Sequence, residues 1–227
     1  MKGSSARALA ALAPQLTGEL LEQALVAVFA LEHEGHRADV LAALAPQLTD
    51  ELLEQALAAA LAFEDEQYRI GALAGLAPRL AGELLEQALA AALTLDDEWY
   101  RTRALAALAP QLTGELLEQA LAAALAFEND WHQAEALAAL VPQLAGKQRN
   151  QALTAALAAA LTLDDEWYRT RALAALAPQL TGELLEQALA AVLAFEDERH
   201  QADVLAALAP PVDGRVAGTS AGRGAYL

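Results

Sequence analysis

The stretch APQLTGELLEQAL, residues 109–121, decides the fold, because it recurs with small changes along almost the whole chain. Five of the six intervals between its marker prolines are 32 residues, and the interval from Pro142 to Pro178 is 36. A fixed period of this size indicates stacked structural repeats rather than one globular core. The marker prolines are Pro14, Pro46, Pro78, Pro110, Pro142, Pro178 and Pro210.

Each unit predicts two helices joined by a short turn. Residues 96–98, Asp-Asp-Glu, are typical of a helix start, with an N-cap carboxylate followed by acids that the helix dipole favours. We expect Pro110 to end this first helix, because proline disfavours the α conformation in the residue before it. Leu112 should then fill the gap between the helices, and Thr113 with Gly114 should cap the second helix.

The last half of the second helix, residues 120–127, is apolar on all sides, so it needs cover that the next unit supplies by stacking. The expected fold is therefore all-α: a right-handed α-solenoid of about six and a half antiparallel helix hairpins with a 32-residue period. The first helices are expected near 4–13, 33–45, 65–77, 97–109, 129–141, 165–177 and 197–209. The second helices are expected near 18–31, 50–63, 82–95, 114–127, 146–163 and 182–195.

The chain divides into a helical-repeat solenoid, residues 1–210, and a degenerate repeat end, residues 211–227. Residues 210–216 align with 178–184, so a seventh second helix is expected to begin there and fail, and the glycine-rich residues 217–227 should be loosely ordered. Neither end has a dedicated polar cap. Three interpretations remain open: an end packs on something, the chain belongs to a longer array, or alanine-rich ends are tolerated.

Charge and composition narrow the classes of partner. The net charge is −17, which repels phosphate backbones and anionic lipids, so nucleic acid and membrane surfaces are not expected partners. The longest apolar stretch, 152–163, is shorter than the roughly 20 residues of a membrane span. The ALAALA string near the N-terminus recurs at 104–109 and 172–177, so we expect it to be part of the repeat rather than a signal peptide. Together with the absence of cysteine, this favours a cytoplasmic location.

Two neighbouring repeat positions form an aromatic column and are the best candidate binding surface. Because tryptophan and tyrosine dominate protein interfaces, the column predicts a site for a peptide or helix. The alternative is that each ring packs over the neighbouring hairpin end, with Arg103 stacked on Trp99 and Arg171 on Trp167. The candidate contact residues of the column are Trp99, Tyr100, Trp131, His132, Trp167 and Tyr168.

The fifth unit departs from the repeat. Residues 146–153 read GKQRNQAL where 114–121 read GELLEQAL, and about four extra residues, near 154–157, follow. Loss of the paired leucines predicts that this first turn protrudes into water, so that Lys147 and Arg149 form a small basic knob. The knob is a further candidate contact point for a partner, or else a neutral insertion.

The acidic clusters and the histidines are the candidate metal ligands of the sequence. The clusters at 64–66, 96–98 and 164–166 lack the glycine turn and alternating ligands of a calcium loop. Helix capping accounts for them, helped by i,i+4 pairs between Asp97 and Arg101 and between Asp165 and Arg169. A zinc site needs three or four ligands, and His33 with His36 has no further ligand nearby in the sequence. No metal site is therefore expected.

The sequence contains no recognisable catalytic constellation. It has no cysteine nucleophile, no phosphate-cradling glycine loop and no Gly-x-Ser-x-Gly turn. Near-identical units also offer near-identical environments, whereas an acid/base pair needs two different ones. We therefore expect no enzyme activity and no cofactor.

Paired helices at this period resemble the α-solenoids that include HEAT, armadillo and tetratricopeptide repeats, although the Trp, Gly and Tyr pattern of the last is missing. The string LAPQLTGELLEQAL more specifically resembles the Leu/Ala-rich repeats of large bacterial multidomain proteins, including NACHT-type signalling ATPases, in which such arrays act as sensors. The resemblance covers about residues 1–210. It carries no functional residue over, and no ATPase motif is present.

Residues 94–127 and 162–195 differ only at Ala124 versus Val192, which indicates recent duplication or design, and the irregular fifth unit favours a natural array. The expected function is a non-catalytic protein-binding scaffold or sensor array whose partner is a protein or peptide. One alternative is a structural solenoid that forms homo-oligomers through its uncapped ends. Another is a detached repeat region of a larger signalling ATPase.

Overall fold

The computed structural model describes residues 2–209, with side chains from residue 5 onward. Within this range the chain is all-α, with thirteen α-helices and no β-strand. The expected failing helix after Pro210 and the loosely ordered 217–227 lie outside the described residues.

Every predicted helix within the described range is present, and each begins within two residues of its predicted start. The first helices of the units are α1 (Lys2–Leu12), α3 (Glu34–Leu44), α5 (Glu66–Leu76), α7 (Glu98–Leu108), α9 (Asp130–Leu140), α11 (Glu166–Leu176) and α13 (Glu198–Leu208). The second helices are α2 (Glu19–Phe29), α4 (Asp50–Leu61), α6 (Gly82–Leu93), α8 (Gly114–Leu125), α10 (Gly146–Thr162) and α12 (Gly182–Val192). Helix α10 has 17 residues where α8 has 12, which confirms the lengthened helix of the fifth unit.

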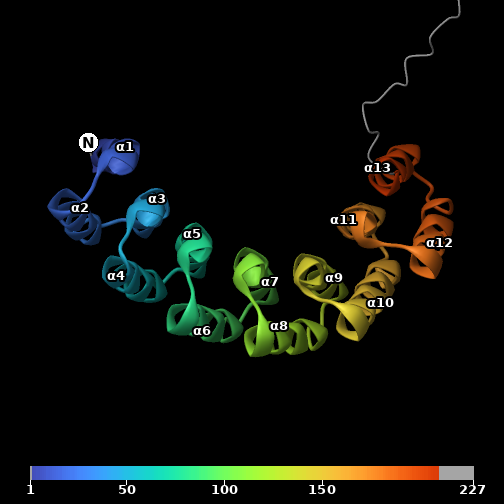
Figure 1. The fold of residues 1–227 in the computed structure, drawn as a ribbon. Helices are drawn as coiled ribbons and strands as arrows, with labels where there is room; N and C mark the ends of the chain where they lie inside the picture. Colours follow the sequence, from blue (N-terminus) through green and yellow to red (C-terminus); the bar gives the residue numbers. More distant parts are fainter. Residues whose placement is uncertain (1, 210–227) are drawn as a thin grey trace, which may run out of the picture.

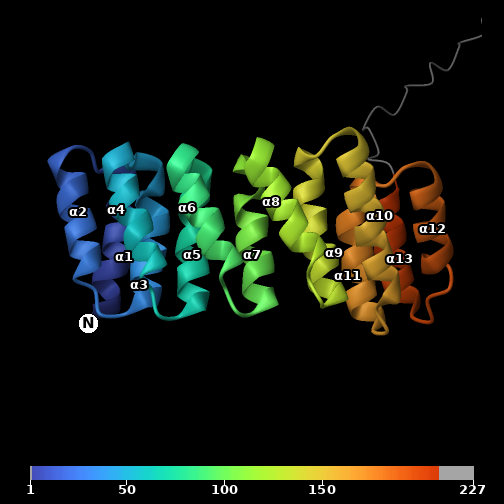
Figure 2. The same cartoon turned by 90° about the horizontal axis from the view of Figure 1, so that it is seen from below.

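The helices form two layers bent into an arc. Figure 1 shows the odd-numbered helices along the inside of the arc and the even-numbered helices along the outside. Figure 2, turned by 90°, shows the helices standing side by side along the length of the molecule. The concave face is therefore built from the odd-numbered helices, which carry the aromatic column near their N-terminal ends.

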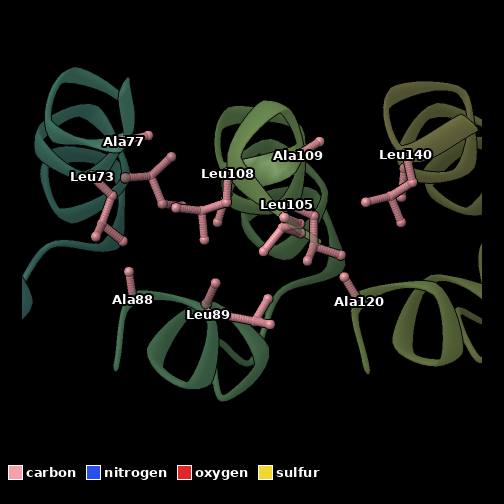
Figure 3. Packing of buried hydrophobic residues seen from close by; sticks show 14 of the residues in the cluster. Leu73, Ala77, Ala88, Leu89, Leu105, Leu108, Ala109, Ala120 and Leu140 are labelled. Atoms are coloured by element: carbon pink, nitrogen blue, oxygen red, sulfur yellow. The ribbon is translucent and has the colours of Figure 1, made fainter. Parts of the chain in front are cut away.

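The core lies between the two layers and continues from unit to unit. Leu105 and Leu108 of α7 are completely buried beside Ala88 and Leu89 of α6 (Figure 3). Alanine at position 88 lets the helices approach closely, while each buried leucine contributes about 1.5–3 kcal/mol of transfer free energy. Because the odd-numbered helices from α3 to α11 all repeat this buried leucine pair, the core is continuous and no hairpin has a separate one.

The first helix of a unit ends beside its marker proline, as predicted, but not for the predicted reason. Ala109, before Pro110, has φ −45° and ψ −44°, so the prediction that Pro110 excludes it from the α conformation is wrong. Pro110 is the second residue of a 3-10 turn, Ala109–Gln111. The N–H groups at the start of such a turn have no partner within it, so a proline there loses no hydrogen bond. The chain turns at Leu112, which is extended and fully buried, and its predicted role as a filler between the helices is confirmed.

The second helices begin at a glycine in four of the six units. Gly114 has φ +53°, a left-handed conformation that glycine adopts without steric cost. Thr113 is the N-cap residue of α8, as predicted, but its side chain makes no capping hydrogen bond. In α4, where Asp50 replaces the glycine, the Thr49 hydroxyl does accept a bond of 3.5 Å from the N–H of Leu52.

Candidate functional site

Acidic or amide N-caps fix the start of helices α5, α7, α9, α11 and α13 and so position the aromatic column. The Asp97 carboxylate accepts a hydrogen bond of 2.8 Å from the N–H of Trp99, and Asp165 does the same for Trp167. Asp65 accepts from the N–H of Gln67, also at 2.8 Å. The predicted capping role of the three acidic clusters is therefore confirmed.

Three aromatic rings from two successive units come together in one cluster. The ring centroids of Trp131 in α9 and Trp167 in α11 lie 6.5 Å apart, and the Tyr168 ring lies 5.2 Å from Trp131 and 4.8 Å from Trp167. Trp99 instead packs edge-on against Tyr100 of its own helix at 4.8 Å. The predicted column is thus divided into a pair on α7 and a cluster that joins α9 to α11.

Two arginines cover part of the tryptophan faces. The Arg103 guanidinium lies 5.0 Å from the Trp99 ring, and that of Arg171 lies 5.0 Å from Trp167 and 5.8 Å from Trp131. The predicted stacking of these arginines is confirmed. It does not bury the rings, because Trp99 remains 40% exposed and Trp167 47% exposed.

These rings line an open groove on the concave face, called here the aromatic groove, with a volume of about 900 Å³. Its walls also carry Arg103, Arg171 and five carboxylates, so negative charge is in excess. A second groove of about 760 Å³ shares Trp99, Arg103 and Glu135 with the first and continues toward α3 over small residues. The five carboxylates of the aromatic groove are Glu128, Asp130, Glu135, Asp164 and Asp165.

Tyr100 and His132 contribute less surface than the sequence suggested. Both are half-buried. The backbone carbonyl of His132 accepts a hydrogen bond of 3.5 Å from the Thr102 hydroxyl of the preceding unit. The Nδ1 atom of His132 is buried and has no hydrogen-bond partner among the described residues. His132 therefore belongs mainly to the contact between units.

The structure does not bring Lys147 and Arg149 to the column. Trp131 lies at the N-terminal end of α9, whereas both basic residues follow the turn beyond its C-terminal end, and eleven residues of helix extend about 16 Å. Arg149 is half-buried, and its guanidinium donates a hydrogen bond of 3.1 Å to the Val141 carbonyl. The prediction that Arg149 protrudes is wrong, since its apolar stem replaces the leucine while its head reaches a carbonyl. Lys147 is exposed.

Sequence reasoning missed three glutamates that connect successive units. Glu98 accepts hydrogen bonds from the N–H groups of Glu128 at 2.9 Å and Asn129 at 3.0 Å. Glu34 and Glu166 make equivalent pairs with the units that follow them. The sequence does distinguish the units that contain these glutamates. A position just after the second helix is phenylalanine in these three units, at 63, 127 and 195, and leucine in the other three, at 31, 95 and 163.

The hydrogen bonds to these glutamates have an electrostatic effect. Backbone N–H groups of Asp65 and Glu64 lower the pKa of Glu34, assisted by the Arg37 guanidinium and opposed by partial burial. In the same way the N–H groups of Glu196 and Asp197 lower the pKa of Glu166. Donors that favour the charged carboxylate are the dominant cause in both cases.

The predicted i,i+4 ion pairs of the acidic clusters are wrong. The Arg101 guanidinium donates to the Leu95 carbonyl at 3.1 Å and pairs with Glu98, not Asp97, at 3.4 Å. Arg169 likewise donates to the Leu163 carbonyl at 2.9 Å. These arginines reach back to the C-terminal end of the preceding helix, where carbonyls lack helical partners and attract positive charge.

His33 and His36 lie close together but serve a local purpose. Their ring centroids are 5.1 Å apart, and His33 Nδ1 accepts a hydrogen bond of 3.1 Å from the N–H of Gly35. Among residues 2–209 no group of three or more His, Cys, Asp or Glu side chains is placed to hold a metal ion. None of the helices in this range is long and apolar enough to cross a membrane.

Comparisons of the chain with protein-family models, with curated proteins and with solved structures gave no match. The fold itself defines the class: an all-α protein whose helices form a repeat-like array.

Proposed function

We propose that the chain is a non-catalytic protein-binding scaffold or sensor array that receives a protein or peptide in the aromatic groove. One observation carries the proposal: tryptophans on three successive concave helices line one open groove of about 900 Å³, and two of them are at least 40% exposed. Exposed, laterally supported aromatic rings are the side chains that most often anchor protein interfaces.

We also propose the handedness, the structural period and the cellular location of the array. The array is a right-handed α-solenoid with a 32-residue structural period, which the spacing of the marker prolines supports. It works in the cytoplasm and binds neither nucleic acid nor membrane, as its net charge of −17 favours. Should it be the detached sensor region of a larger signalling ATPase, the effector would be encoded in a neighbouring reading frame.

Substitution of the three tryptophans tests the scaffold proposal. In a quantitative pull-down from the source organism, Trp99→Ala, Trp131→Ala and Trp167→Ala combined should reduce capture of the main partner at least tenfold. The control combines Val26→Ala, Glu54→Ala and Gln87→Ala, which are exposed residues of the outer layer. Capture that is unchanged in the tryptophan variant, with its helical circular dichroism intact, contradicts the proposal.

A second candidate function is self-association through the ends of the stack. Leu20 of α2 is 58% exposed, whereas Leu52, its counterpart in the next unit, is 9% exposed. At the other end Leu189 of α12 is 39% exposed, whereas the equivalent Leu89 is 1% exposed. Both surfaces are buried by a neighbouring unit elsewhere in the chain, so a second copy could cover them. Light scattering over a concentration series tests this, and a monomeric mass at high concentration contradicts it.

A further inference from the structure

We propose that the aromatic groove binds an extended peptide segment of a partner protein, and that the arginine side chains of this peptide make the main contacts. This inference rests on the proposed scaffold function and specifies the chemistry of its partner.

Three of the five carboxylates that line the groove have no partner in the part of the chain that the structure describes. Asp165 is occupied by the N–H of Trp167, and Asp130 accepts a hydrogen bond of 2.7 Å from the Thr162 hydroxyl. Among the described residues, the side chains of Glu128, Glu135 and Asp164 have neither a hydrogen bond nor an ion pair. Their charges are therefore free to meet cations brought by a partner.

The rings of the groove already show which cation fits. Each tryptophan has an arginine of the same chain over its face, with Arg103 and Arg171 both 5.0 Å from a ring centroid. A partner's arginine can make the same contact on the exposed parts of Trp99 and Trp167 while its N–H groups reach a neighbouring carboxylate. A planar guanidinium combines stacking with paired hydrogen bonds, which the ammonium of lysine cannot do.

The shape of the surface favours an extended chain. The groove crosses the N-terminal ends of α7, α9 and α11, a distance of about 20 Å for helices packed about 10 Å apart. The adjoining groove has a floor of small residues, among them Gly71, Ala74 and Ala106, so a peptide backbone can lie close to it. About six extended residues span this length, since each covers about 3.3 Å, so a peptide of about eight residues covers it with one residue to spare at each end.

The three tryptophans of the chain all line the groove, so tryptophan emission reports on this site. The probe is an acetylated and amidated peptide of about eight residues, with arginines separated by alanine and leucine and no aromatic residue. We expect a saturable change in tryptophan emission. The same peptide with lysine for arginine should bind about tenfold more weakly, and the version with glutamate should not bind.

Charge removal locates the contact. Glu128→Gln, Glu135→Gln and Asp164→Asn combined should weaken binding of the arginine peptide at least about tenfold. The matched control, Glu54→Gln, Glu86→Gln and Glu186→Gln, changes the net charge equally on the outer layer and should alter the affinity less than about twofold. Equal losses in both variants would mean that only the overall charge attracts the peptide, and would overturn the proposal.

Other outcomes would also overturn it: equal binding of the lysine or glutamate peptide, no binding of the arginine peptide, or emission that changes with protein concentration alone because a second copy fills the groove. If the arginine peptide fails while the tryptophan variant still loses its partner in the pull-down, the inference falls and the scaffold proposal stands.

Discussion

The Glu98 carboxylate accepts a hydrogen bond of 3.0 Å from the backbone N–H of Asn129, 31 positions further along the chain. Its other oxygen accepts from the N–H of Glu128 at 2.9 Å. A side chain at the start of α7 thus accepts hydrogen bonds from the backbone N–H groups that lead into α9. The contact lies at the end of the helices that carries the aromatic groove, so it sets the relative position of two of its walls.

Glu98→Gln should lower the free energy of unfolding by about 1 kcal/mol, because an amide offers one acceptor oxygen to two N–H donors and loses the charge. Urea denaturation followed by circular dichroism measures the change. The control is Glu66→Gln, because Glu66 has the same place in α5 but accepts no such pair of bonds in the described structure. Equal destabilisation by the two substitutions would contradict a specific role for Glu98.

Acid should destabilise the stack partly through Glu34 and Glu166. Their pKa values in the folded chain lie below the ordinary 4.5, because backbone N–H groups stabilise the carboxylates. A lowered folded pKa gives stability that is complete above the unfolded pKa and is lost as the pH falls through the folded value. The window of loss therefore begins near pH 4.5 and extends below it.

The double variant Glu34→Gln with Glu166→Gln should flatten this part of the pH dependence. Urea midpoints measured between about pH 7 and pH 3 should fall less steeply below about pH 4.5 in the variant than in the original chain. Parallel curves over this range would show that other carboxylates account for the acid sensitivity.

The sequence predicted well what short stretches encode. Asp97 is recognisable as an N-cap because its partner, the N–H of Trp99, is two residues away. Leu112 is recognisable as a buried filler because it is the one large apolar residue of its turn. Such features depend on local backbone geometry, which the residue pattern determines directly.

Contacts between units were less predictable. The bond from Asn129 to Glu98 depends on the spacing between hairpins, and the cluster of Trp131 with Trp167 depends on the rotation of α9 relative to α11. Arg149 shows a different difficulty. A polar residue at a leucine position suggested exposure, whereas a long side chain can cover apolar surface and still place its charge on a carbonyl.

Close approach of α3 and α5 depends on Gly75. A Cβ atom at this position would meet the Cβ of Ala42 and lie 2.6 Å from its Cα, which is backbone and cannot move aside. Gly75→Ala should therefore lower the free energy of unfolding by about 1–3 kcal/mol by overpacking this contact. Urea denaturation measures it.

Gly71, one turn earlier on the same helix, is the matched control. A Cβ there meets nothing within 4 Å, so Gly71→Ala should stabilise the chain by about 0.5–1 kcal/mol through helix propensity alone. Stabilisation by both substitutions would show that α3 and α5 do not approach as closely as described.

Thr102 and Thr170 are equivalent residues in the two near-identical units, yet only one has a hydrogen-bond partner. Both are buried, and the Thr102 hydroxyl donates to the His132 carbonyl at 3.5 Å, whereas the Thr170 hydroxyl has no partner. Thr170→Val should therefore raise the free energy of unfolding by about 1 kcal/mol, because a buried unsatisfied hydroxyl is replaced by a methyl group of the same shape. Thr102→Val should be neutral or destabilising by about 0.5 kcal/mol, because it leaves the carbonyl without that donor. Urea denaturation of the two single variants measures the difference, and equal effects would mean that the two hydroxyls have the same environment in solution.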